Sequence, residues 1–176
     1  WASRRAWARR APGRSHARGV LSSPPMHTPL LQIRKLDARA TVPSYQSAQA
    51  AGLDLSACLP EASPQLVVKP GEIVLVPCGF AMSIPIGYEA QVRARSGLAS
   101  KHGITVPNGP GTIDSDYRGE VKVAIINLGR EAYTVTHGQR IAQMVVAPVA
   151  HAVVREVETL DDTARGSGGF GSTGVH

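Results

Sequence analysis

Apolar and polar residues alternate along several short stretches of this chain, which is the pattern of strands that bury one face. Residues 88–95 alternate without a break, at the two-residue period of a half-buried strand. Residues 120–123 begin in the same way and become wholly apolar at 124–126, as expected where a strand enters a core. Residues 73–80 and 141–149 are apolar, β-branched runs of strand length. We therefore expect strands in all four regions.

Turn-forming residues separate these runs at 70–71, 85–87, 127–129 and 137–138. Only residues 96–102 have helical character, and only for one or two turns. The 18 glycines and 13 prolines also favour turns and short strands over long helices. A length of 176 residues suits a single domain with a sizeable core. The pattern predicts an all-β protein, a jelly-roll-like antiparallel β-sandwich or barrel with one short helix.

The composition excludes several classes of site and partner. No apolar run approaches the length that spans a membrane, so no membrane partner is expected. Cys58 and Cys78 form no CxxC pair, and no cluster of cysteine and histidine predicts a structural zinc site. We expect both cysteines to be reduced, buried thiols.

The formal net charge of +6 belongs to one end of the chain. Residues 1–25 hold six arginines and no acidic residue, whereas basic and acidic residues are equal in number from Met26 onward. The body is therefore neutral, which argues against nucleic acid as a partner. We expect 1–25 to be a disordered or non-native leader before a start at Met26, and the protein to be cytoplasmic. The Arg-rich, acid-free composition of 1–25 leaves an organellar transit peptide as the alternative.

The segment 106–119 carries the densest chemistry of the chain. Proline and glycine lead into two carboxylates, Asp114 and Asp116, followed by Tyr117 and an arginine, and Gly119 closes the stretch. Between two strand-like runs, this pattern predicts a hairpin with a polar tip. Such a tip can offer backbone hydrogen bonds, a general base and a stacking surface, which together suit a nucleotide pocket.

The segment 165–174 is rich in glycine, with five glycines in ten residues. Alone it has little to bury and should be mobile. Glycine backbone can wrap closely around phosphates, Arg165 adds charge, and Phe170 can stack on a base. A flexible linker or disordered terminus is the alternative for a tail of this composition.

Five segments of the chain, taken together, resemble the motifs of the trimeric deoxyuridine triphosphate nucleotidohydrolases (dUTPases). The resemblance runs from about Thr28 to the C-terminus, and the order and spacing of the segments make it specific. The matching segments are 51–55 (AGLDL), 95–99 (RSGLA), 108–119 (NGPGTIDSDYRG), 138–143 (GQRIAQ) and 165–174 (RGSGGFGSTG).

The resemblance implies a jelly-roll subunit in a homotrimer whose three active sites are shared. One subunit would supply the second and fourth motifs, a neighbour the hairpin, and the third its C-terminal tail. The implied reaction is the Mg²⁺-dependent hydrolysis of dUTP to dUMP and pyrophosphate, which cleanses the nucleotide pool and supplies dUMP. The expected organisation is a leader at 1–25, a β domain at 26–164 and a glycine-rich lid at 165–176.

The resemblance also implies residue roles on the phosphate side. Asp114 is expected to act as the general base for the water that attacks the α-phosphorus, although an Asx-turn role is the alternative. Arg95, Ser96 and Gly97 are expected to bind phosphates. From the residues alone, Arg95 could be a solvated charge, and Ser96 could be a helix N-cap. Gln143, a polar residue in an apolar run, is expected beside the phosphate and the attacking water.

The remaining roles concern the base, the sugar, the metal and the lid. The expected uracil readers are Asn108 and the backbone of Thr112, Ile113 and Asp114. Tyr117 is expected under the deoxyribose, with a core or interface position as the alternative, and Lys122 is a weaker substrate contact. Asp116 is expected to be structural or solvent-facing, and Arg140 is either a site residue or an ion-pair residue. Asp54 is expected to reach Mg²⁺ through water. The expected lid residues are Arg165, Phe170, Ser172 and Thr173.

Two other functions remain open from the sequence. A dCTP deaminase-like enzyme would share the trimer and an RSxLA-like segment, but Asp114, Tyr117 and the Phe-containing tail favour a dUTPase. A catalytically silent nucleotide-binding module of the same fold is the other alternative. The joint presence of Asp114, Arg95, Gln143 and Tyr117 argues against it.

Overall fold

The computed structural model describes residues 28–169 of the chain. Among these residues, no helix is long and apolar enough to cross a membrane. The expected leader, 1–25, lies outside the described residues. The elements are β1 (Gln32–Lys35), β2 (Ser44–Tyr45), β3 (Leu53–Ser56), β4 (Gln65–Val68), β5 (Ile73–Ser83), β6 (Tyr88–Ala94), α1 (Ser96–His102), β7 (Ile104–Thr105), β8 (Gly111–Ile113), β9 (Glu120–Asn127), β10 (Tyr133–Thr136) and β11 (Arg140–Pro148).

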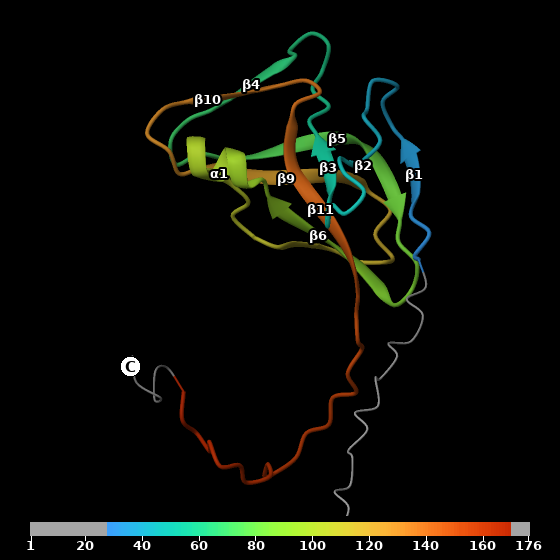
Figure 1. The fold of residues 1–176 in the computed structure, drawn as a ribbon, viewed down its shortest axis with the longest axis vertical. Helices are drawn as coiled ribbons and strands as arrows, with labels where there is room; N and C mark the ends of the chain where they lie inside the picture. Colours follow the sequence, from blue (N-terminus) through green and yellow to red (C-terminus); the bar gives the residue numbers. More distant parts are fainter. Residues whose placement is uncertain (1–27, 170–176) are drawn as a thin grey trace, which may run out of the picture.

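Within 28–169, the strands form two main sheets and a small one (Figure 1). One main sheet has the order β1-β5-β9-β7, the other has the order β2-β3-β11-β6-β8, and β4 pairs with β10. Every pair is antiparallel. The core cluster draws on both main sheets, with Phe80 and Val123 from one and Leu55 and Met144 from the other. The prediction of an all-β antiparallel fold with one short helix is confirmed.

The alternating stretches occupy the positions that their periodicity predicts. In β6, Ala90 and Val92 are buried, Gln91 between them is partly buried, and Arg93 is exposed. In β9 the alternation of burial continues through the wholly apolar part, because Ile125 is buried and its neighbours are only partly so. The outer face of β9 is therefore only partly buried at its apolar end, although a wholly apolar run would also suit a strand buried on both faces.

The segment 106–119 is more than the hairpin that its sequence predicts. The strands on either side, β7 and β9, do pair antiparallel. The connection between them crosses to the other sheet, where β8 pairs with β6. The pairing fixes 111–113 against β6, so Asp114 follows directly after a paired strand.

Both cysteines are free and buried, as expected. Burial raises the pKa of the Cys78 thiol to about 12, so this side chain stays neutral in the core. Burial also raises the pKa of Cys58. Neither residue has the lowered thiol pKa of a reactive cysteine.

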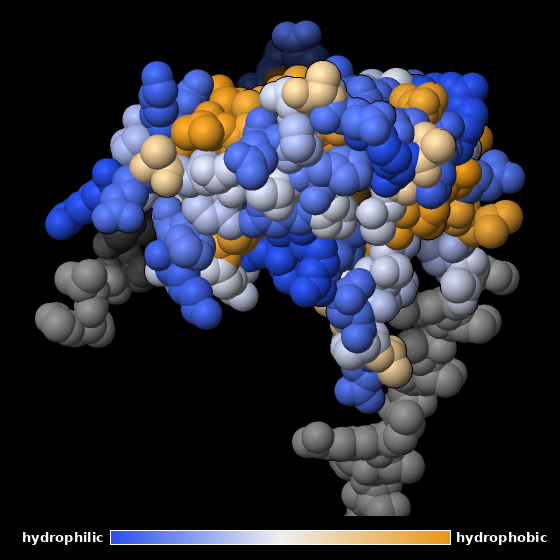
Figure 2. Space-filling model, turned by 90° about the horizontal axis from the view of Figure 1, so that it is seen from above, coloured by the Kyte–Doolittle hydropathy of each residue, from blue (hydrophilic) through white to orange (hydrophobic). Residues whose placement is uncertain are grey.

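After β11 the chain leaves the body as an extended arm (Figure 1). Its residues 150–165 are exposed, and Val153 and Val154 are 96% and 92% exposed. On the body, Ile73 and Leu75 of β5 are also exposed. Figure 2 shows apolar residues gathered in patches on a face that is otherwise mostly hydrophilic. Exposed apolar patches of this kind are typical of surfaces that bind a protein partner.

Candidate active site

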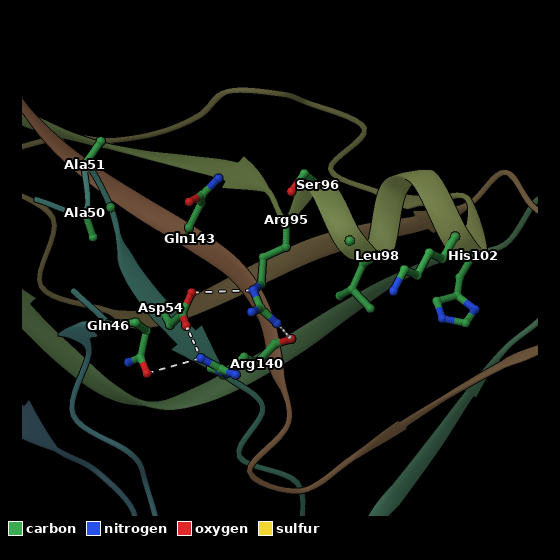
Figure 3. A pocket seen from close by; sticks show the side chains of 13 residues that line it. Gln46, Ala50, Ala51, Asp54, Arg95, Ser96, Leu98, His102, Arg140 and Gln143 are labelled. Atoms are coloured by element: carbon green, nitrogen blue, oxygen red, sulfur yellow. Dashed lines mark hydrogen bonds and ion pairs between the residues drawn. The ribbon is translucent and has the colours of Figure 1, made fainter.

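A large cavity of about 540 Å³ lies beside the junction of β6 and α1 (Figure 3). It is lined by residues from the loop between β2 and β3, from β3, from the β6–α1 junction and α1, and from β11. Its polar lining includes Gln46, Asp54, Arg95, Ser96, Arg140 and Gln143.

The junction of β6 and α1 places the RSG sequence at the cavity wall. Arg95 keeps extended backbone angles (φ −85°, ψ 125°) and is the N-cap of α1. Ser96 is therefore the first helical residue, and the interpretation of Ser96 as the N-cap is wrong. The space where Gly97 would carry a Cβ is open, with no atom within 4 Å. A ligand can therefore approach the backbone closely at Gly97.

Asp54 holds two guanidinium groups at the wall of the cavity (Figure 3). Its Oδ2 accepts a hydrogen bond from Arg140 Nη1 at 2.9 Å, and its Oδ1 lies 3.5 Å from Arg95 Nε. Arg95 Nη1 also donates to the Arg140 carbonyl at 3.0 Å, and Arg140 Nη1 donates to Gln46 Oε1 at 3.1 Å. The Asp54 side chain is only 12% exposed. Arg140 therefore makes an ion pair, one of the two roles considered for it, and also lines the cavity. The two cations are held where a polyanion could bind.

Gln143 occupies the middle of β11, in register with Asp54 on one side and Arg93 on the other. Its Nε2 donates to the carbonyl of Ala94 at 3.1 Å. A Cβ on Gly52 would lie 3.3 Å from its Oε1, so the glycine gives the amide room. The polar residue in an apolar run thus has the partner that its partial burial requires, and it lines the same cavity as Arg95.

The residues of the 106–119 segment line other cavities. Thr112, Ile113, Asp114, Tyr117 and Lys122 share a cavity of about 270 Å³. Asn108 borders a smaller one, of about 60 Å³, together with Thr112, Ile113 and Lys122. Asp114 and Asp116 are both exposed, in agreement with the solvent-facing alternative for Asp116.

Tyr117 is held by its neighbours and is exposed, so the core alternative for it is wrong. Its hydroxyl donates to the carbonyl of Glu120 at 2.9 Å. A Cβ on Gly119 would collide with the Tyr117 ring, whose Cζ lies 2.6 Å from that position. The Glu120 side chain is fixed in turn, because it accepts a hydrogen bond from the Gly79 N–H at 3.1 Å and pairs with Lys122 at 3.5 Å. The ring therefore has a defined place above Gly119.

The two groups of candidate residues stand at opposite ends of β6. Ile113 is paired with Ala90, so Asp114 lies at the N-terminal end of the strand. Arg95 follows the C-terminal end, five residues after Ala90, which corresponds to about 17 Å of extended chain. A single chain therefore does not bring Asp114 together with Arg95 and Gln143.

Of the four expected lid residues, Arg165 is the one that lies within the described part of the chain. Arg165 is exposed, and its Nε donates to the Gly168 carbonyl at 2.7 Å. Phe170, Ser172 and Thr173 lie outside the described residues. Gln46, Lys101 and His102 also line the large cavity, although sequence reasoning did not select them. The helical spacing of Lys101 from Gly97 was the one signal that could have pointed to it.

Comparisons with known proteins agree on one family. A family model for dUTPase matches residues 38–174. The deoxyuridine 5'-triphosphate nucleotidohydrolase of Desulfotalea psychrophila is 58% identical over 135 residues, which cover 77% of this chain and 88% of that relative. The enzyme of the same name from Rhizobium meliloti is 59% identical over 134 residues, covering 76% of this chain and 83% of the relative.

Solved structures give the same answer for the fold. The dUTPase of Staphylococcus bacteriophage 80alpha, solved with dUPNHPP, superposes with a TM-score of 0.74 at 28% sequence identity. The match covers 83% of this chain and 99% of the phage protein.

Proposed function

This chain belongs to the dUTPase family, and we propose that it hydrolyses dUTP to dUMP and pyrophosphate at sites shared between the subunits of a homotrimer. Hydrolysis of a deoxyuridine triphosphate is the activity for which its relatives are named. The names of the relatives therefore favour dUTP hydrolysis over a dCTP deaminase-like reaction and over a catalytically silent nucleotide-binding module. Its products suit an enzyme that cleanses the nucleotide pool and supplies dUMP.

The separation along β6 carries the proposal of a shared site. Phosphoryl transfer needs the water-activating base and the phosphate-binding groups around one phosphate chain. Asp114, which follows β8, and Arg95, which follows β6, are separated by about 17 Å or more along the direction of β6. A complete site therefore needs Asp114 of one subunit beside Arg95 of another. The exposed apolar residues of β5 and of the arm support an assembled protein.

In the proposed reaction, Asp114 acts as a general base. Its carboxylate takes a proton from a water molecule, whose oxygen forms a bond to the α-phosphorus. The bond between the α-phosphorus and the bridging oxygen breaks, and pyrophosphate leaves with that oxygen. Arg95, with the Ser96 hydroxyl and the Gly97 backbone, holds the phosphate chain in line for this attack. Gln143 orients the phosphate and the attacking water from the middle of β11.

We propose that Mg²⁺ is held mainly by the substrate. Mg²⁺ prefers oxygen ligands and keeps several of its waters. The described residues offer no group of three or more His, Cys, Asp or Glu side chains placed to hold a metal ion. Asp54 lines the cavity, but each of its oxygens already faces an arginine. These residues fit an ion bound by phosphate oxygens, with Asp54 reaching it through water. When bound, the ion would neutralise phosphate charge.

The 106–119 segment supplies base and sugar recognition in this proposal. Asn108 and the backbone of Thr112, Ile113 and Asp114 read the uracil edge, and Lys122 contacts the substrate from β9. Tyr117 stacks under the deoxyribose. Arg165 and the residues Phe170, Ser172 and Thr173 would close over the bound nucleotide as a lid.

The substrate assignment is tested by pyrophosphate release from dUTP, dCTP, dTTP and UTP, each with and without Mg²⁺. We expect rapid, Mg²⁺-dependent release from dUTP and slow release from the other three. Equal release from dCTP, or ammonia as the product, would favour another reaction. Binding of dUTP without any turnover would favour the silent module.

Replacing Tyr117 by alanine should weaken the discrimination against ribose. The fixed ring leaves no room for a 2′-hydroxyl, so its loss should reduce the preference for dUTP over UTP by about 10-fold. The measurement is the ratio of kcat/KM for the two nucleotides. Tyr117→Phe is the matched control, because it keeps the ring and loses only the hydrogen bond to Glu120. An unchanged ratio in Tyr117→Ala would count against a sugar-selecting role.

A further inference from the structure

We propose that Lys101 is a phosphate-binding residue of the large cavity, with its ammonium group against the phosphate chain of dUTP. This inference rests on the proposed function, which it extends by one residue that neither the motif segments nor the base-recognition segment includes. Lys101 lies in the last turn of α1 and lines the same cavity as Arg95 and Gln143.

The geometry of α1 directs Lys101 to the same place as Gly97. The two residues are four apart, so they lie on one face of the helix, one turn from each other. Gly97 leaves open space beside the backbone at that face. A phosphate group that approaches the Gly97 backbone therefore comes within reach of the long Lys101 side chain, whose Cα is about 6 Å further along the helix axis.

The charges around the cavity also favour this role. Arg95 and Arg140 share the single carboxylate of Asp54, so part of their positive charge is already balanced. Within residues 28–169, the Lys101 ammonium has no ion-pair or hydrogen-bond partner. A triphosphate brings several negative charges, and an unpaired cation at the wall stabilises them more than one that must first leave a carboxylate.

His102 is a weaker candidate for the same role. It lines the cavity as well, but its ring packs against the ring of Tyr133 with centroids 5.0 Å apart. Lysine and histidine in a last helical turn can also act only on the helix dipole. The test must therefore separate phosphate binding from helix stability.

The experiment compares Lys101→Met, Lys101→Gln and Lys101→Arg with Lys69→Met, which removes an exposed lysine in the turn after β4. Calorimetry with tripolyphosphate measures binding, steady-state kinetics gives KM for dUTP, and thermal unfolding measures stability. We expect both neutral variants to weaken tripolyphosphate binding and to raise KM about 10-fold, which corresponds to about 1.4 kcal/mol. Lys101→Arg should restore most of the affinity, and Lys69→Met should match the unmodified protein.

The outcomes are separable. If both neutral variants bind tripolyphosphate as tightly as Lys69→Met, the phosphate-binding role is refuted, and a fall in unfolding temperature alone would assign Lys101 to the helix dipole. If the unmodified protein releases no pyrophosphate from dUTP, the proposed function fails instead. The tripolyphosphate titration still decides the role of Lys101 in that case, because it requires no turnover.

Discussion

Asp114→Asn lowers kcat for dUTP by about 10²- to 10⁴-fold, the range expected when a general base is lost, while dUTP still binds. The amide has almost the shape of the carboxylate, so the exposed segment that carries it keeps its fold, but it cannot accept the proton of the attacking water. Pyrophosphate release gives kcat, and calorimetry with dUTP gives the dissociation constant. Size-exclusion chromatography verifies that the assembly is intact.

Asp116→Asn is the matched control for this prediction. Asp116 is exposed in the same segment and carries the same charge two residues away. We expect its turnover to stay within about 2-fold of the unmodified protein, as for other surface substitutions. Near-normal turnover in Asp114→Asn, or an equal loss in both variants, would refute the assignment of Asp114 as the base.

A mixture of two inactive variants, Asp114→Asn and Arg95→Ala, recovers activity when their subunits are allowed to exchange. Each variant alone lacks one half of every site. In random mixed trimers, an intact Asp114 meets an intact Arg95 in about one quarter of the sites, so up to about 25% of the unmodified activity should return. The measurement is pyrophosphate release after the two proteins are unfolded together and refolded.

Two controls define the mixing experiment. Proteins refolded separately and then combined briefly should stay inactive, because their subunits have not exchanged. A double variant carrying both substitutions, mixed with the unmodified protein, should not exceed the activity of the unmodified subunits. No recovery in properly mixed trimers would mean that Asp114 and Arg95 act within one chain, against their separation along β6.

The strands and the helix were accessible from the sequence because their signals are local. The alternation at 88–95 depends only on which face of β6 is buried, and α1 begins and ends where residues 96–102 predict. The N-cap was not accessible, because the extended conformation of Arg95 is set by the end of β6 and not by the capping preference of Ser96.

The arrangement of the site depends on contacts between distant segments, which no local pattern encodes. The pairing of β8 with β6 determines that Asp114 and Arg95 lie apart, and it follows from the sheet register. The pairing of Asp54 with Arg140 joins residues 86 positions apart. The sequence could identify the residue types, through resemblance to a family, but not which of them one chain brings together.

Asp114 and Arg95 lie at the two ends of β6, so in the proposed trimer each β6 strand would take part in two active sites. In the proposed trimer, one end of a strand would contact the nucleotide in one site and the other end the phosphates in the next. Ligand binding that orders one end would therefore have a direct route to the neighbouring site, through a strand hydrogen-bonded to β8 on one side and β11 on the other. The three sites would form a closed ring, in which cooperativity between nucleotides can arise without any hinge or moving domain.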